Sequence, residues 1–248
     1  MKRLRIFGGP NGSGKTTSIN RIKERIGQDL PIDFFGVYIN ADDIEAELSQ
    51  SRKLKLDTYP LNISTDQLQN FFRDSKFSPV KLGIPDLWKY FSISEKQLEV
   101  DESVSINSYI AADIAEFLRN ELLETGESFS FETVMSDRSK LSLIKKAKEL
   151  GYRIYLYYVA TEDPEINISR VNVRVSEKGH NVDPELIKKR YYKSLENLIE
   201  AVHLTNRAYL FDNSGSVSIP FAEITEGFDV TILEPDHIPR WFIKYLVY

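Results

Sequence analysis

The stretch that decides the fold is Gly9–Thr16, which reads GPNGSGKT. It matches the phosphate-binding pattern G-x-x-x-x-G-K-[ST] at every fixed position. The apolar run Leu4–Phe7 precedes it, and Ile19, Ile22 and Ile26 follow it at helical spacing. A strand, a glycine-rich turn and a helix, in this order, are the context in which the pattern binds phosphates. The sequence therefore predicts a nucleotide-binding loop.

Each part of this loop has an expected task. The glycines let backbone N–H groups turn inward around phosphate oxygens, at the positive end of the following helix. We expect Lys15 to reach the β- and γ-phosphates and the Thr16 hydroxyl to bind Mg²⁺. The expected nucleotide-binding residues are Gly9, Pro10, Asn11, Gly12, Ser13, Gly14, Lys15, Thr16, Thr17 and, further along the chain, Asn213.

Strand and helix patterns alternate along the rest of the chain. Apolar or aromatic runs predict further strands at about 34–39, 128–131, 152–159 and 208–211. Helical spacing predicts helices at about 105–124, 137–150, 164–177 and 183–204. This alternation predicts an α/β fold with a mainly parallel five-stranded sheet flanked by helices. A hairpin is expected from 217–221 and 230–233.

The chain is expected to form a single P-loop kinase domain over residues 1–248. Residues 51–102 hold scattered turn signals and two amphipathic pieces, so we expect a mostly helical insertion there. Either a packed structural addition or a cap on the substrate side fits this insertion. Residues 216–248 form a C-terminal extension.

Composition narrows the function classes. The net charge of -5 argues against extended electrostatic binding to the phosphate backbone of a nucleic acid. Cysteine is absent, which excludes disulfides, thiolate metal sites and thiol nucleophiles and fits a reducing, cytoplasmic setting. No stretch approaches the roughly 18 apolar residues of a membrane span, and the basic N-terminus lacks the apolar region of a signal peptide.

Carboxylates follow two of the predicted strands. Asp42 and Asp43 come after the run 34–39, and Glu132 after the run 128–131. Ligands of open α/β sheets gather outside such strand ends. A carboxylate there can take the proton of an attacking hydroxyl, and Asp can equally cap a helix. We interpret Asp42 as the candidate base, Asp43 as the candidate cap, and Glu132 as a candidate for Mg²⁺ or substrate.

Basic residues gather on two later helices. Arg170 and Arg174 are four residues apart and share a helix face, and Arg190 lies on the next helix. Arginines on a lid can stabilise the charge of a transferring phosphate, and a solvated basic face is the alternative. No two histidines show metal-ligand spacing, so no zinc site is expected.

These segments together resemble the zeta-toxin-like P-loop kinases of bacteria, in particular a stand-alone branch related to the UDP-N-acetylglucosamine kinase toxins. The segments that carry the resemblance are Gly9–Thr17, Ile39–Ile44, Phe131–Thr133, Arg170–Val175, Gly179–Val182, Arg190 and Asp212–Ser214. They fall within roughly residues 4–50 and 105–216, and their order and spacing are more specific than any one of them.

The resemblance implies an adenylate-kinase-like core that uses ATP or GTP with Mg²⁺. It places the catalytic base on Asp42 and the substrate-facing pair on Glu132 and Thr133. The arginines that contact the transferring phosphate fall on Arg170 or Arg174 and on Arg190. In the toxin branch the implied reaction is phosphorylation of a UDP-N-acetylsugar, and the implied protein partner is an antitoxin.

The chain departs from the sugar-kinase toxins on the substrate side. Those toxins carry an arginine four residues after the glutamate of the third motif, where this chain has Ser136; the nearest arginine is Arg138. Near their second lid arginine this chain has Gly179 and His180. Arg138 and His180 are therefore the candidates for further substrate contacts.

Three functions remain open on the sequence. The leading hypothesis is a kinase that phosphorylates a hydroxyl of a small molecule. The second is a nucleotide-switched ATPase that binds a protein. The third is a kinase without a toxin role, acting on a metabolite or on nucleic-acid ends.

Overall fold

The computed structural model describes residues 1–176 and 182–247, and the chain divides into two compact units. The first unit comprises residues 1–36 and 130–248, and the second comprises Val37–Phe129. The expected insertion lies within the second unit, together with the segments that flank it.

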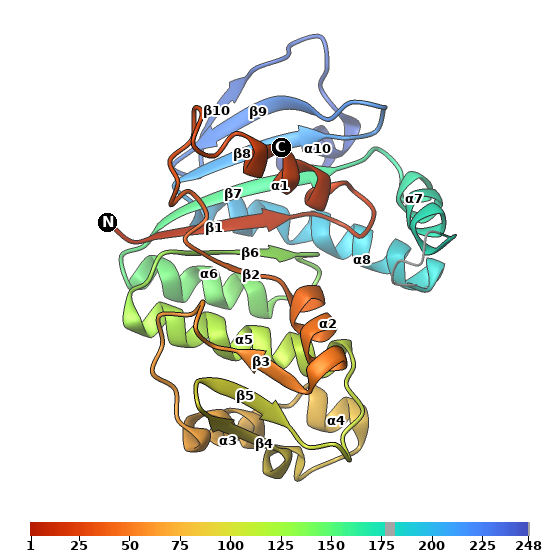
Figure 1. The fold of residues 1–248 in the computed structure, drawn as a ribbon. Coiled ribbons are helices and arrows are strands. Elements are labelled where there is room, and N and C mark those ends of the chain that lie inside the picture. The colour runs from red at the N-terminus through yellow and green to blue at the C-terminus, as the bar shows by residue number, and fades with distance from the viewer. Residues whose placement is uncertain (177–181, 248) are drawn as a thin grey trace. The chain divides into compact units, whose positions relative to one another are not determined.

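The first unit is built on a sheet that follows the sequence pattern closely. Its helices and strands are β1 (Arg3–Gly8), α1 (Lys15–Glu24), β6 (Phe129–Thr133), α6 (Ser139–Glu149), β7 (Arg153–Ala160), α7 (Pro164–Ser176), α8 (Pro184–Glu196), α9 (Leu198–Leu204), β8 (Arg207–Asp212), β9 (Ile219–Thr225), β10 (Asp229–Ile232) and α10 (Arg240–Leu246). Figure 1 shows α1 on one side of the sheet and α8 on the other.

The strands of the first unit lie in the order β10-β9-β8-β7-β1-β6. β7 pairs in parallel with β1 and with β8. The predicted C-terminal hairpin forms as β9 and β10, and β9 adds to β8 in the antiparallel sense. The mainly parallel α/β sheet expected from the alternating pattern is therefore confirmed, and the hairpin extends it.

Buried apolar side chains from neighbouring strands line one face of the sheet in this unit. Ile154, Leu156 and Tyr158 alternate along β7 and are fully buried. Ala208 and Leu210 on β8 repeat the alternation. Burial of these apolar side chains provides the main driving force for this layer. It also fixes the carboxyl ends of β1, β7 and β8 at one edge, where the glycine-rich loop begins.

Specific side chains determine where α8 begins and where it ends. Asp183 caps α8 by accepting from the Leu186 N–H, with Pro184 at the first helical position, as the sequence predicts. The prediction of one continuous helix at 183–204 was wrong. The structure has two helices there, because α8 ends at Glu196 and α9 begins at Leu198. Between them the buried Asn197 side chain donates to the Met135 carbonyl at 3.0 Å.

The second unit holds a helical layer and a small sheet. Its elements are β2 (Val37–Ile39), α2 (Ala41–Ser51), β3 (Lys53–Lys55), α3 (Thr65–Asp74), α4 (Ser78–Leu82), the 3₁₀ helix η1 (Leu87–Tyr90), β4 (Phe91–Ser94), β5 (Gln97–Val100) and α5 (Ser108–Thr125). The antiparallel sheet β3-β5-β4 was missed in the sequence analysis, because its strands are only three or four residues long.

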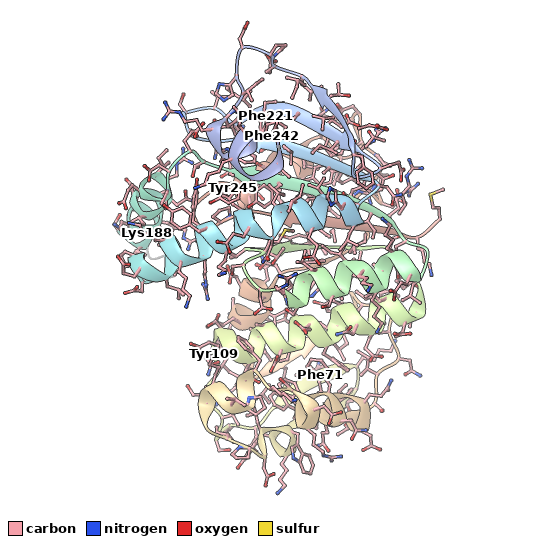
Figure 2. The ribbon with its side chains drawn as sticks, turned by 180° about the vertical axis from the view of Figure 1, so that it is seen from behind. Phe71, Tyr109, Lys188, Phe221, Phe242 and Tyr245 are labelled. Atoms are coloured by element: carbon pink, nitrogen blue, oxygen red, sulfur yellow. The ribbon has the colours of Figure 1, made fainter. Side chains whose placement is uncertain are left out.

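The insertion has a core of its own. Leu68 and Phe72 on α3 are fully buried, and the Phe72 ring stacks on Phe91 with centroids 4.0 Å apart. Phe71 approaches Phe117 of α5 at 5.4 Å. Phe71 is labelled in Figure 2. These contacts show that the insertion is packed within the second unit, against α5. None of the described helices is both long and apolar enough to cross a membrane.

Candidate nucleotide-binding site

The glycine-rich loop takes a backbone path that side chains would obstruct. Gly9, Gly12 and Gly14 have φ values of +141°, +72° and +97°, a region that L-residues rarely adopt. A Cβ on Gly12 would lie 2.5 Å from the Asn167 carbonyl oxygen. The pattern glycines are therefore required both by backbone conformation and by close approach, and Gly14 leads directly into α1.

Lys15, Thr16 and Glu132 meet beside this loop. The Thr16 hydroxyl donates to the Glu132 carboxylate, with oxygens 3.2 and 3.3 Å away. The Lys15 Nζ lies 4.0 Å from Glu132 Oε1 and donates to the Pro10 carbonyl at 2.9 Å. The Lys15 side chain is only 7% exposed. The structure thus brings together the three residues to which the sequence assigned phosphate and Mg²⁺ binding.

The residue types around Thr16 fit Mg²⁺. This ion prefers oxygen ligands and is usually held by one or two protein groups together with phosphates and water. The Thr16 hydroxyl and the Glu132 carboxylate are such groups and are within hydrogen-bonding distance of each other. No cluster of three or more His, Cys, Asp or Glu side chains suited to a metal occurs in the described residues.

Two polar atoms inside the loop are left without a partner. Asn11 Oδ1 and Ser13 Oγ are buried and make no hydrogen bond within the described part of the chain. A buried polar atom without a partner costs free energy. Together with the crowded glycines, these atoms fit a loop whose polar groups serve a bound ligand.

Asn167 supports the loop from α7 and was missed in the sequence analysis. It is fully buried, and its amide nitrogen donates to the Asn11 carbonyl at 2.5 Å. Thr161 donates to its other side-chain atom. The available signal was its spacing, because Asn167 and the buried Val171 are four residues apart on one helix face. A polar residue on a buried face needs a partner, and here the partner is the phosphate-binding loop.

The segment after β8 also contacts the loop. The Asn213 amide donates to the Ser13 carbonyl at 2.7 Å. Arg170 donates from its two terminal nitrogens to the carbonyls of Asn213 and Gly215, at 2.7 and 2.9 Å. Asn213 therefore lies beside the phosphate-binding loop, and its contact there is with the main-chain carbonyl of Ser13. Arg170 holds the segment after β8 in this structure, whereas the family resemblance placed an arginine that contacts the phosphate on either Arg170 or Arg174.

Thr133 and Arg138 have local partners. The Thr133 hydroxyl accepts from the Met135 N–H at 3.0 Å, at a residue with φ of +60°. Arg138 forms an exposed ion pair with Glu200, 2.7 Å apart. Glu132 thus reaches the phosphate-binding loop, Thr133 shapes the turn that follows, and Arg138 is engaged with α9.

A buried tyrosine joins α8 to the end of β7. Tyr191 donates from its hydroxyl to the Thr161 carbonyl at 2.6 Å. Burial, with a smaller contribution from Glu162, raises the pKa of the Tyr191 phenol. The hydroxyl therefore stays protonated and available as a donor, and it fixes the segment that leads into α7.

The other two predicted arginines lie on separate helices. Arg174 is exposed on α7, and Arg190 is half-buried on α8. Lys188 on α8 reaches Glu165 on α7 at 3.8 Å, so a charge pair links the two helices. Figure 2 labels Lys188. His180 lies outside the described residues.

In the second unit, Asp42 occupies the first turn of α2 directly after β2. The N-cap of this helix is Asn40, whose side chain accepts from the Asp42 N–H at 3.0 Å. The interpretation of Asp43 as the cap was therefore wrong, because Asn40 already satisfies the helix end. Both aspartate side chains are exposed, so the Asp42 carboxylate is accessible.

A model of the zeta toxin family matches residues 78–219, which is more than half of the chain. The chain belongs to the zeta toxin family. The resemblance found in the sequence motifs is thereby confirmed. The matched region contains Glu132, both helices with the predicted arginines, and Asn213. It begins after Gly9–Thr16, so that loop is recognised by its own sequence and geometry.

The individual proteins similar to this zeta toxin family member either have low sequence identity to it or match only a part of the chain. An uncharacterized protein of Haemophilus influenzae is 35% identical over 63 residues, which cover 25% of this chain and 45% of that protein. The crystal structure of AvrRxo1-ORF1:AvrRxo1-ORF2 with sulphate ions has a TM-score of 0.57 at 13% identity, over 95% of this chain and 62% of that chain. A structure of the same pair with ATP has a TM-score of 0.56, with the same identity and coverage. At this identity the likeness shows the fold alone.

Proposed function

We propose that this zeta toxin family member is a kinase that transfers the γ-phosphate of ATP or GTP to a hydroxyl group of a small molecule. The observation that carries the proposal is the group of Lys15, Thr16 and Glu132 beside a loop of the G-x-x-x-x-G-K-[ST] pattern. Lys15 supplies a mobile positive charge for the β- and γ-phosphates. Thr16 and Glu132 would hold Mg²⁺, which neutralises phosphate charge when it is bound.

The reaction needs a proton acceptor. The acceptor oxygen forms a bond to the γ-phosphorus, the bond from that phosphorus to the bridging oxygen breaks, and ADP or GDP leaves. The proton of the hydroxyl passes to the Asp42 carboxylate. This role of Asp42 rests on its sequence motif and on its exposed side chain. Arg174 and Arg190 are the proposed arginines for the charge on the transferring phosphate, since Arg170 is engaged with two carbonyls.

The proposed acceptor class is a UDP-N-acetylsugar, as the family resemblance implies. The substrate side differs from that of the sugar-kinase toxins, because Ser136 stands where they have an arginine and Arg138 pairs with Glu200. The side chains proposed to contact the acceptor are Glu132, Thr133, Arg138 and His180. Another hydroxyl-bearing metabolite is the alternative acceptor.

The direct test is acceptor-dependent ADP release. Purified protein would receive Mg²⁺-ATP with UDP-N-acetylglucosamine, with UDP-N-acetylmuramic acid or with no acceptor. A UDP-N-acetylsugar kinase gives ADP and a phosphorylated sugar nucleotide in equal amounts, and Lys15→Ala gives neither. Equal ADP release with and without these two sugar nucleotides would contradict the UDP-N-acetylsugar as acceptor and leave another metabolite, or an ATPase, as the alternative.

A protein antitoxin is the proposed partner. The structural neighbour AvrRxo1-ORF1 was crystallised with a second protein, AvrRxo1-ORF2, in the presence of ATP. By analogy alone, a partner protein would bind this chain and suppress its activity. If binding of such a partner requires nucleotide while acceptors never stimulate ADP release, the chain is a nucleotide-switched ATPase.

A further inference from the structure

A buried carboxylate lies at the end of β8. Asp212 is 2% exposed, and its Oδ1 accepts from Ser214 Oγ at 2.8 Å and from Trp241 Nε1 at 3.2 Å. Its Oδ2 lies 3.0 Å from His237 Nε2. A carboxylate removed from water needs such donors. Two of them, His237 and Trp241, come from the end of the chain.

The C-terminal segment His237–Leu246 is firmly packed on the first unit. Trp241 and Phe242 are each 3% exposed, and their rings contact Phe221 of β9 with centroids 5.4 and 5.3 Å apart. Figure 2 shows Phe221 and Phe242 side by side. The Arg240 N–H donates to the Glu162 carboxylate at 2.7 Å. The C-terminal segment is therefore anchored both to β9 and to the connection between β7 and α7.

The residues after Asp212 connect three parts of the candidate site. Ser214 Oγ accepts from the Glu162 N–H at 2.9 Å. The Asn213 amide holds the Ser13 carbonyl, and the carbonyls of Asn213 and Gly215 hold Arg170. A change in the position of Asp212 is thus passed on to the phosphate-binding loop and to α7 through direct hydrogen bonds.

We propose that the C-terminal segment sets the affinity of the phosphate-binding loop for nucleotide. His237 and Trp241 are positioning residues that act through Asp212. Their two donors fix the orientation of the carboxylate, which fixes Ser214 and the neighbouring Asn213. Asn213 then keeps the Ser13 carbonyl turned toward it, so that the N–H groups of the loop are ordered before phosphate binds.

This inference rests on the proposed function only in taking Gly9–Thr16 to bind nucleotide phosphates. It predicts an effect on the phosphates themselves and not on the base. Inorganic tripolyphosphate, which has no base, should therefore respond to changes in the C-terminal segment in the same way as ATP.

The experiment compares binding of Mg²⁺-ATP and of Mg²⁺-tripolyphosphate to full-length variants by calorimetry. Trp241→Phe keeps the ring packing and removes the N–H donor, and His237→Ala removes the other donor. We expect each to weaken both ligands by about 5–30-fold, since hydrogen bonds to charged groups are the stronger class. His237→Gln restores a donor and should stay within about threefold of wild type.

His203→Ala is the matched control. His203 stacks on Phe228 and contacts neither Asp212 nor the phosphate-binding loop in the described structure, so both affinities should be unchanged. Hydrogen exchange of the backbone amides of residues 9 and 11–16 provides a second readout, with faster exchange expected in Trp241→Phe and His237→Ala only.

Unchanged affinities and unchanged exchange in both variants would overturn the inference. Loss of ATP affinity with tripolyphosphate affinity intact would also overturn it, because the effect would then lie on the base. A wild-type protein that binds neither ATP, GTP nor tripolyphosphate would contradict the proposed function together with the inference.

Discussion

The Thr16 hydroxyl donates to the Glu132 carboxylate across 116 residues of sequence, at 3.2 Å. This contact joins the start of α1 to the end of β6, and Lys15 lies 4.0 Å from the same carboxylate. A hydroxyl, a carboxylate and an ammonium group are the protein groups that a Mg²⁺-nucleotide complex needs at its phosphates.

Glu132→Gln should weaken the dependence of nucleotide binding on Mg²⁺. The amide keeps the size of the side chain and its acceptor for Thr16 but loses the negative charge that attracts the cation. By analogy with other changes around metal ligands, we expect Mg²⁺-dependent affinity or turnover to fall roughly 10–100-fold. The measurement is ATP binding with Mg²⁺ and with a chelator. Glu200→Gln, at an exposed ion pair, is the control and should leave the Mg²⁺ dependence intact.

Gly12→Ala should abolish nucleotide binding and destabilise the protein. The new Cβ would lie 2.5 Å from the Asn167 carbonyl oxygen, at a φ of +72°. Gly27→Ala is a close control, because Gly27 has a φ of +80° with nothing within 4 Å. The control bears the backbone strain of about 1–2 kcal/mol without the collision. If both variants bind ATP equally well, the close approach of Asn167 does not shape the loop.

Asn167→Ala should loosen the loop from α7. The change leaves the Asn11 carbonyl without its donor and removes the partner of Thr161, so we expect the free energy of unfolding to fall by about 1–3 kcal/mol. Nucleotide affinity should fall as well. Asn172→Ala, at an exposed position of the same helix, should change neither quantity. Denaturant unfolding and calorimetry provide the two measurements.

Alkaline pH should destabilise the chain through the half-buried Tyr157. Burial raises the pKa of the Tyr157 phenol from 10.0 to about 12. Because the folded state holds this proton more tightly than the unfolded state, the stabilising contribution is complete below about pH 10 and is lost as the pH rises toward 12. Tyr157→Phe should therefore lose less stability than wild type between about pH 8 and pH 11. Tyr192→Phe, at an exposed tyrosine, should behave as wild type.

Asp42→Asn should separate chemistry from binding. General-base catalysis typically contributes about 10²–10⁴-fold, so turnover should fall by this amount while nucleotide affinity stays within a few-fold. Asp43→Asn should keep most of the activity, since Asn40 already caps α2. Near-normal phosphotransfer by Asp42→Asn would show that another group accepts the proton.

Local sequence signals were sufficient for much of the fold. The GPNGSGKT stretch, the apolar strand runs, and the helix ends near residues 124 and 150 depend on neighbouring residues, and the structure confirms them. The break at Asn197 could not be predicted locally, because its partner is the distant Met135 carbonyl. The same reason applies to Arg170, whose partners lie more than forty residues away in sequence.

The residues of the candidate site also fall into two groups, those that local sequence signals predict and those that depend on distant partners. Lys15, Thr16 and Glu132 could be predicted because the phosphate-binding pattern and the strand ends fix them in space. Asn167, His237 and Trp241 were missed, since their roles depend on which carbonyl or carboxylate the fold brings to them. A polar residue on an apolar helix face, as at Asn167, is the one local signal that could have been used.

We propose above all that this chain transfers phosphate from a nucleotide to a small-molecule hydroxyl. The most direct test incubates Mg²⁺-ATP and a bacterial metabolite extract with wild type, with Lys15→Ala, and with Lys23→Ala as a control lysine on the same helix, followed by mass spectrometry. We expect one product that gains the mass of a single phosphate, with wild type and Lys23→Ala but not with Lys15→Ala. ATP consumption by wild type with no phosphorylated product, or the same product with Lys15→Ala, would contradict it.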